Sequence, residues 1–174
     1  MNLATERLDI RRFRPADAVA FAAYRSDPAV ARYQSWTPPV PLDEARRLVT
    51  SFAEDSEDAP GWFQYAVELR AEGALIGDVA IRRRGRLAEL GCTLASAYQG
   101  KGYATEAVSA VLNRVVATGV HKITAECDAR NEASARLLDR LGFTREGLRH
   151  EHTWLKGEWT DDLLFGLLSR DWTG

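Results

Sequence analysis

A strand-like segment and a helix-like segment meet at the stretch QGKGYA, residues 99–104. Gly100 and Gly102 allow the backbone to turn tightly and leave its N–H groups uncovered by side chains. The first turn of a following helix adds unpaired N–H donors and the positive end of a dipole. The stretch therefore predicts either a pyrophosphate cradle or a simple tight turn. After it, apolar residues recur at the spacing of an amphipathic helix: Ala104, Ala107, Val108, Val111, Leu112, Val115 and Val116.

Other phosphate-binding loops fit this stretch badly. A P-loop needs four residues between its first glycine and a Gly-Lys-Ser/Thr string, and the sequence has no such string. A Rossmann fingerprint that starts at Gly100 and Gly102 needs Gly or Ala at the position of Thr105. A dinucleotide-binding enzyme is the weaker interpretation.

Outward from this junction, hydrophobic periodicity predicts alternating strands and helices in one domain, residues 1–174. The expected fold is α/β (α+β), with a mixed, mostly antiparallel sheet of about seven strands and four helices. Residues 82–86 are expected to be a solvated link between two strands, and residues 33–41 a proline-rich loop. Strands are expected near residues 7–12, 63–69, 75–82, 87–94, 123–127, 143–154 and 159–168, and helices near 15–27, 42–53, 104–116 and 131–142.

Composition narrows the functional classes. The formal net charge of -2 gives no global reason to expect nucleic acid as a partner. No apolar run approaches the ~20 residues of a membrane-spanning helix, and the first residues lack the apolar core of a signal peptide. Cys92 and Cys127 have no metal-like spacing and are expected to be buried free thiols, as is typical of a cytoplasmic protein. We expect no metal site, no nucleic acid and no membrane partner.

Three ordered motifs resemble the GNAT superfamily of N-acetyltransferases. The family signature Gln/Arg-x-x-Gly-x-Gly/Ala is matched at residues 99–104, and the element Asn-x-x-Ser/Ala is matched at Asn131 and Ser134. The string Leu-Gly-Phe, which closes a helix in the family, is present at residues 141–143. The resemblance covers essentially the whole chain. Residues 5–8 and 157–162 look like the branch that contains bacterial ribosomal-protein N-terminal (Ser/Ala) acetyltransferases.

The resemblance implies how the chain binds acetyl-CoA, its expected cosubstrate. Strands four and five of a GNAT fold splay apart and open a slot for the thioester. A backbone N–H near Thr93 or Leu94 would polarise the thioester carbonyl and lower the activation barrier by about 3 kcal/mol. Asn131 would bind the pantetheine, although a helix cap is an equally good interpretation. The predicted acetyl-CoA-binding residues are Thr93, Leu94, Gln99, Gly100, Lys101, Gly102, Tyr103, Ala104, Thr105 and Asn131.

The reaction also needs a proton acceptor, because an ammonium ion has no lone pair with which to attack. Glu126 lies where several relatives carry a general base, and Glu89 on the fourth strand is the other candidate. Water chains without a single base are a third possibility. Many relatives place a tyrosine acid where this chain has Leu138, which cannot donate a proton. Ser134 lies one turn earlier and is the remaining candidate near the departing thiol.

The sequence leaves three functions open. The leading hypothesis is an N-acetyltransferase that acts on a peptide or protein N-terminal α-amine. The second is an acetyltransferase for a small amine, such as an aminoglycoside, polyamine or amino acid. The third is a non-catalytic acetyl-CoA sensor. Family resemblance alone also suggests a homodimer.

Overall fold

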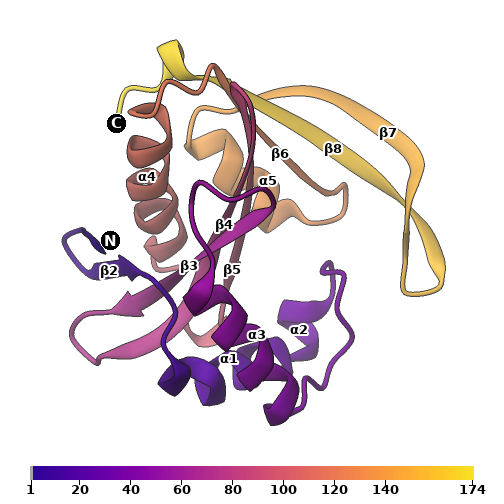
Figure 1. Cartoon of the computed structure of the whole chain (residues 1–174). Helices are drawn as coiled ribbons and strands as arrows, with labels where there is room; N and C mark the ends of the chain where they lie inside the picture. Colours follow the sequence, from indigo (N-terminus) through magenta and orange to yellow (C-terminus); the bar gives the residue numbers. More distant parts are fainter. Residues whose placement is uncertain (1) are drawn as a thin grey trace.

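One sheet organises the structure, a computed structural model that describes residues 2–174 (Figure 1). All neighbouring strands are antiparallel except β5 and β6, which are parallel, so the mixed, mostly antiparallel sheet is confirmed. The sheet order is β1-β2-β3-β4-β5-β6-β8-β7. The strands are β1 (Asn2–Ala4), β2 (Leu8–Arg11), β3 (Trp62–Leu69), β4 (Ala74–Arg84), β5 (Leu87–Leu94), β6 (Lys122–Asp128), β7 (Thr144–Leu155) and β8 (Glu158–Leu168).

The helices lie on both faces of the sheet, and the described elements exceed the expected number by one strand and one helix. The additions are the three-residue β1 and the four-residue α2, which Asp27 caps by accepting from the Ala29 N–H at 2.8 Å. The expected link at residues 82–86 was wrong in part, because β4 continues to Arg84 through pairing with β5. The helices are α1 (Ala18–Arg25), α2 (Pro28–Ala31), α3 (Leu42–Glu54), α4 (Tyr103–Val116) and α5 (Glu132–Arg140), with short 3-10 turns at Pro15–Asp17, Ser96–Tyr98 and Ser169–Asp171.

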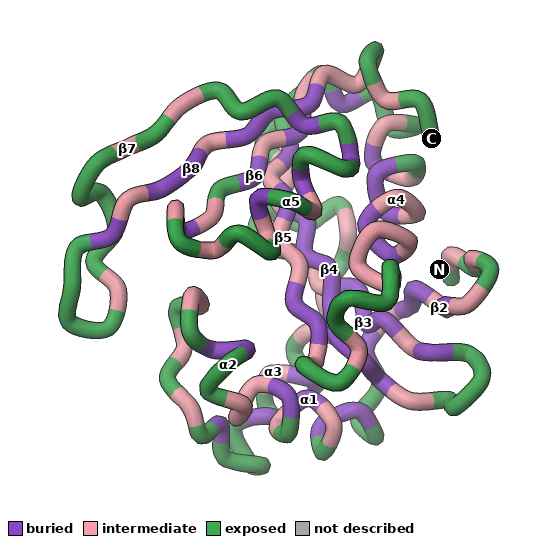
Figure 2. The backbone as a smooth tube through the Cα atoms, turned by 180° about the vertical axis from the view of Figure 1, so that it is seen from behind, coloured by how far each residue is buried: buried purple, intermediate pink, exposed green. Residues whose placement is uncertain are grey.

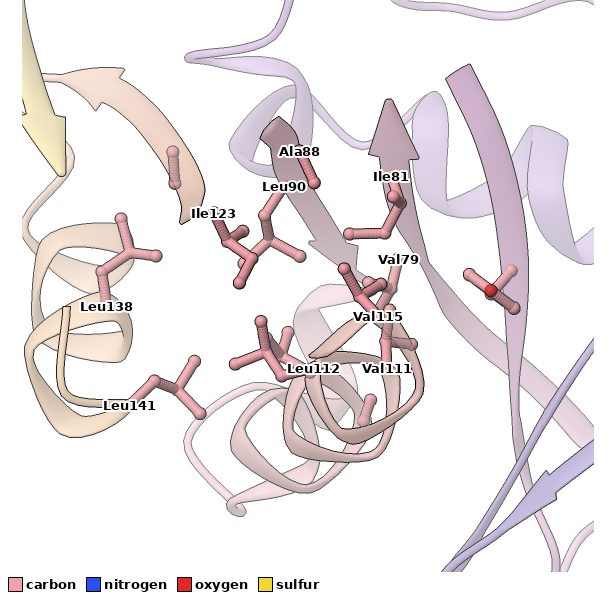
Figure 3. Close-up of a cluster of buried hydrophobic side chains, with 14 of the residues drawn as sticks. Val79, Ile81, Ala88, Leu90, Val111, Leu112, Val115, Ile123, Leu138 and Leu141 are labelled. Atoms are coloured by element: carbon pink, nitrogen blue, oxygen red, sulfur yellow. The ribbon is translucent and has the colours of Figure 1, made fainter. Parts of the chain in front are cut away.

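The larger core lies between the sheet and helices α4 and α5. Figure 3 shows Val111, Leu112 and Val115 of α4 pointing at the strands that carry Val79 and Leu90. Burial of each such side chain stabilises the fold by about 1.5–3 kcal/mol. The predicted apolar face of this helix is therefore the face that it packs against the sheet.

The second core lies on the opposite face of the sheet, under α1 and α3. Phe21 of α1 is fully buried, and Val49 of α3 packs in the same cluster. Buried segments follow both helices and the central strands, whereas the β7–β8 hairpin is exposed over much of its length (Figure 2). Because side chains alternate along a strand, β4 contributes to both sides: Val79 belongs to the larger core, and Asp78 contacts α1.

Candidate active site

The loop between β5 and α4 is held in a conformation that favours glycine. Gly100 has φ +74°, and Gly102, the residue before α4, has φ +82°. A Cβ added at Gly100 would meet none of the described atoms within 4 Å, so the loop backbone is open there. The first N–H groups of α4 and the positive end of its dipole lie at the same place. The tight turn is therefore present, and the anion cradle at this backbone stays a prediction.

Residues 5–7 form hydrogen bonds with this loop and with the first turn of α4. Arg7 Nε donates to Glu106 Oε2 at 2.7 Å, and an Nη of Arg7 donates to the Lys101 carbonyl at 3.0 Å. The Thr5 hydroxyl donates to Glu106 Oε1 at 2.6 Å. The Arg7 guanidinium also lies 4.4 Å from the centre of the Tyr103 ring. These contacts join residues 5–7 to the glycine loop and to the first turn of α4.

A groove of about 520 Å³ runs along this loop, the end of β5 and helix α5. Among the described residues, its charged lining side chains are Arg32, Arg136 and Arg140. Arg140 also donates to the Thr105 hydroxyl at 3.2 Å. We call it the arginine groove. Its lining includes Cys92, Thr93, Leu94, Gln99, Gly100, Gly102, Ala104, Thr105, Asn131, Ser134 and Leu137.

The groove ends where two strands separate. β5 and β6 pair only from Leu87↔Lys122 to Glu89↔Thr124, and β5 then continues to Leu94 without pairing to β6. The Gln99 side chain donates to the Leu94 carbonyl at 2.9 Å and fixes the end of β5. The splay expected between the fourth and fifth strands is thus found between β5 and β6, because β1 adds one to the strand numbering.

A second cavity, of about 390 Å³, lies beyond the splay, between α1, β4, β6 and the loop that follows α2. Three carboxylates line it: Asp78, Glu126 and Asp128. We call it the carboxylate cavity. It shares part of its lining with the arginine groove, namely Tyr33, Gln34, Cys92, Thr93, Asn131, Ser134 and Leu137. The two cavities therefore meet at the splay.

All three carboxylates have an arginine nearby, and two of them accept hydrogen bonds from it. Glu126 is 57% exposed and accepts a hydrogen bond from Arg149. Asp128 accepts from Arg130 Nε at 3.0 Å and from an Nη at 2.8 Å. The Arg130 guanidinium holds the pKa of Asp128 below its usual range. Asp78, by contrast, is nearly inaccessible to solvent and bonds the Tyr24 hydroxyl.

Comparison with known proteins identifies the fold and its chemistry. The family described as "Acetyltransferase (GNAT) domain" matches residues 7–144. The chain belongs to the GNAT family. An uncharacterized N-acetyltransferase, p20, of Bacillus licheniformis is 30% identical over 178 residues, covering 99% of each chain. This GNAT protein is therefore an N-acetyltransferase, and enzymes of this family use acetyl-CoA.

Solved structures agree with this family assignment. A GNAT acetyltransferase from Bacillus anthracis superposes with a TM-score of 0.87 at 28% identity, covering 98% of this chain and 99% of that one. The ribosomal-protein-S5-alanine acetyltransferase from Vibrio fischeri superposes with a TM-score of 0.80 at 26% identity, and each chain is covered completely. The expected GNAT fold is thus confirmed.

The arginine groove contains most of the residues that the motifs predict to bind acetyl-CoA. Lys101 and Tyr103 point to other partners: the Lys101 ammonium lies 5.6 Å from the centre of the Tyr98 ring, and Tyr103 lies against Arg7. Asn131 accepts from the Ser134 N–H at 3.1 Å, so it caps α5 while also lining the groove. The groove is lined by Thr93, Leu94, Gln99, Gly100, Gly102, Ala104, Thr105 and Asn131.

The structure separates the two predicted proton acceptors of this GNAT enzyme. Glu126 lines the carboxylate cavity. Glu89 lies where β5 still pairs with β6, and it is bound to Arg82 and, at 3.8 Å, to Arg84. Ser134, the predicted hydrogen-bond donor to the thiol, lines both cavities. These three roles stay predictions, of which Glu126 and Ser134 have the matching location.

Sequence reasoning missed two residues of the site. Asp78 is the charged residue inside the otherwise apolar run of residues 74–81, and a charge in such a run is the signal that could have found it. Tyr33 was assigned only to a loop, yet it lines both cavities, and its hydroxyl donates to the Arg130 carbonyl at 3.3 Å. Loop residues carry no periodic signal, so only the fold brings Tyr33 to the splay.

Across residues 2–174, the structure places no group of three or more His, Cys, Asp and Glu side chains that could hold a metal ion. Over the same residues, every helix is too short or too polar to cross a membrane.

Proposed function

We propose that this enzyme transfers the acetyl group of acetyl-CoA to the N-terminal α-amine of a peptide or protein. The observation that carries the proposal is the meeting of two cavities of opposite charge at the β5–β6 splay. The arginine groove suits an anionic substrate, and the carboxylate cavity suits a cationic one. The bond to be made therefore lies between the two cavities.

The arginine groove fits the chemistry of acetyl-CoA. The open backbone at Gly100 and the N-terminus of α4 offer N–H donors for a pyrophosphate. Arg136 and Arg140 add positive charge on the side of α5. The free edge of β5 near Thr93 and Leu94 would supply the N–H that polarises the thioester carbonyl and holds the developing negative charge.

The carboxylate cavity fits a positively charged amine. An α-amine has a pKa of about 8, so a fraction is neutral at pH 7, whereas a lysine amine near 10.4 is almost fully protonated. The side chains of Gln34, Ser35 and Gln64 also line the cavity and offer amide and hydroxyl groups to a peptide backbone. The likeness to the S5-alanine acetyltransferase of Vibrio fischeri supports the same class of acceptor.

A small polyvalent amine is the second candidate acceptor. The observation that favours it is the presence of three carboxylates in one cavity, because a polyamine or aminoglycoside carries several cations. Glu126 and Asp128 are already paired with Arg149 and Arg130, which lowers the attraction of the cavity for further cations. This pairing is the reason that a single α-ammonium is the preferred acceptor.

The test follows the release of CoA thiol from acetyl-CoA with a panel of acceptors. The panel contains short peptides beginning with Ala or Ser, the same peptides with a blocked N-terminus, polyamines, aminoglycosides and amino acids. We expect turnover with the free peptides above the background without acceptor, and none with the blocked peptides. Turnover with a polyamine or aminoglycoside and not with peptides would replace the first candidate with the second.

A further inference from the structure

Asp78 lines the carboxylate cavity and comes from β4, the strand that pairs with β5 beside the splay. In the β4–β5 pairing it lies opposite Thr93, one of the residues that line both cavities. Directly opposite residues of antiparallel strands have Cβ atoms about 5 Å apart on the same face of the sheet. The Asp78 carboxylate is therefore next to the place where an amine and a thioester would meet.

Helix α1 fixes this carboxylate from the other side. The Tyr24 hydroxyl donates to Asp78 Oδ2, and an Nη of Arg25 lies 3.6 Å from the same oxygen. The Arg25 guanidinium is stacked between two rings, 4.3 Å from the centre of Phe21 and 4.1 Å from that of Trp36. Two aromatic rings thus hold Arg25, and a third aromatic side chain, Tyr24, bonds Asp78 directly.

The titratable groups around Asp78 come from two elements. Tyr24 and Arg25 face it from α1, and Cys92 lies near it on β5, whereas β3 places the uncharged Ala66 opposite. Burial raises the pKa of Asp78, while the charge of Arg25 and the hydrogen bond from Tyr24 act in the opposite direction. A carboxylate with a raised pKa is a stronger base than an exposed one, which suits proton transfer near neutral pH.

Glu126 differs from Asp78 in exposure, and both Glu126 and Asp128 differ from it in pairing, since the Asp128 side chain is as buried as that of Asp78. Glu126 is more than half exposed and bound to Arg149, and Asp128 is bound by two nitrogens of Arg130. The side chain of Asp78 is 4% exposed, and its nearest guanidinium nitrogen lies at 3.6 Å, beyond hydrogen-bond distance. Of the three carboxylates, Asp78 therefore has the greatest capacity to accept a proton.

We propose that Asp78 accepts the proton that the acceptor ammonium loses, directly or through one water molecule. This inference rests on the proposed function, because it requires an amine in the carboxylate cavity. The neutral amine then forms the N–C bond to the acetyl carbon, and the C–S bond of the thioester breaks. The electron pair leaves with the sulfur as CoA thiolate. The nitrogen loses its second proton as the amide forms, and this proton passes to the thiolate, directly or through water, to give CoA thiol. Asp78 then returns its own proton to solvent.

The decisive experiment compares the pH profiles of kcat/KM for the wild type and Asp78→Asn. The variant can react only with amine that is already neutral in solution. Its kcat/KM should therefore rise about tenfold per pH unit up to the amine pKa near 8. The wild type binds the ammonium and deprotonates it, so its profile should level off at lower pH. We expect a loss of about 30-fold at pH 6.5 that narrows as the pH approaches 9, with unchanged affinity for acetyl-CoA.

A second variant keeps the proposal testable if Asp78→Asn folds poorly. Tyr24→Phe removes the hydrogen bond that lowers the pKa of Asp78, so the acid limb of the wild-type profile should move to higher pH. Asp43→Asn on the exposed face of α3 is the matched control, with an unchanged profile. Thermal melting of each variant checks that it is folded.

Three outcomes would overturn the proposal. Parallel profiles for wild type and Asp78→Asn would exclude proton transfer to this residue, and so would an acid limb that Tyr24→Phe leaves in place. A pH-dependent loss in Glu126→Gln equal to that of Asp78→Asn would assign the proton to Glu126. The measurement uses whichever amine the wild type acetylates best, so failure of the peptide hypothesis is recorded separately, by the acceptor panel.

Discussion

The arginine groove and the carboxylate cavity share one wall and differ in almost everything else. Both contain Cys92, Thr93 and Ser134, yet one is lined by arginines and the other by three carboxylates and one arginine. The sign of the lining charge changes across the β5–β6 splay. Two substrates of opposite charge would therefore bind on opposite sides of the splay, where the edge of β5 does not pair with β6.

The two cavities also differ in how the chain builds them. The arginine groove is formed largely by two segments, residues 92–105 and 131–140, each of which carries a family motif. The carboxylate cavity takes side chains from α1, β3, β4, β5, β6 and α5 and from the loop after α2. The difference shows that cosubstrate recognition is a local property of this sequence, whereas acceptor recognition depends on tertiary packing.

The largest expected effect is loss of acetyl-CoA binding in Gly102→Glu. The φ of +82° disfavours any side chain, and a carboxylate at the cradle would repel the pyrophosphate. Calorimetry should show affinity weakened on the order of 100-fold, about 2.7 kcal/mol.

A matched control for this change is available in the β7–β8 turn. Gly157→Glu introduces the same residue at a glycine with φ +92° and no described atom within 4 Å of an added Cβ. It should retain wild-type affinity for acetyl-CoA. Equal affinity of Gly102→Glu and the wild type for acetyl-CoA would show that this loop does not bind the pyrophosphate.

A smaller effect is expected for Arg140→Ala in the arginine groove. Arg140 lines the groove and donates to Thr105, so its loss removes positive charge near the cradle. We expect about fivefold weaker binding of acetyl-CoA at low salt, and a smaller difference at 0.5 M salt because the charges are then screened.

Arg140→Ala should raise the KM for acetyl-CoA and leave the KM for the amine unchanged, because Arg140 lines only the arginine groove. Arg46→Ala is the control, since Arg46 pairs with Asp43 on the exposed surface of α3. A larger change in the amine KM than in the acetyl-CoA KM would contradict the division of the site into two charged cavities.

The sequence predicted what periodicity and local motifs encode. The helix over residues 104–116 and the strand before it were located nearly to the residue, because a seven-member apolar stripe and the glycine turn bound them. The cap at Asn131 and the turn at Gly142, with φ +82°, follow from equally local rules.

The missed features depend on contacts between distant segments. β1 has only three residues and exists because it pairs with β2, and Arg83 and Arg84 join β4 through their pairing with Ala88 and Leu87. Asp78 is 54 positions from Tyr24 in the chain, so their hydrogen bond leaves no local signal. Charged residues in strands were therefore assigned to solvent or edges, when packing against α1 determines where Asp78 lies.

The smallest expected effect concerns the two thiols that line the carboxylate cavity, Cys92 and Cys127. Burial raises the pKa of Cys92 to about 12 and that of Cys127 to about 11, from an ordinary value of 9.0. At pH 8 the thiolate fraction of Cys127 is then on the order of one in a thousand, and that of Cys92 tenfold less. Alkylation by iodoacetamide should accordingly be slow, faster at Cys127, and accelerated as the pH rises toward 10.

Acetyl-CoA should change only one of these rates. Cys92 lines both cavities, whereas Cys127 lines the carboxylate cavity alone, so bound acetyl-CoA should slow alkylation at Cys92 and leave Cys127 accessible. Peptide mapping by mass spectrometry after timed alkylation distinguishes the two sites. Equal protection of both thiols would mean that the cosubstrate reaches into the carboxylate cavity, and the boundary between the two charged regions would then lie nearer to Glu126 than to Thr93.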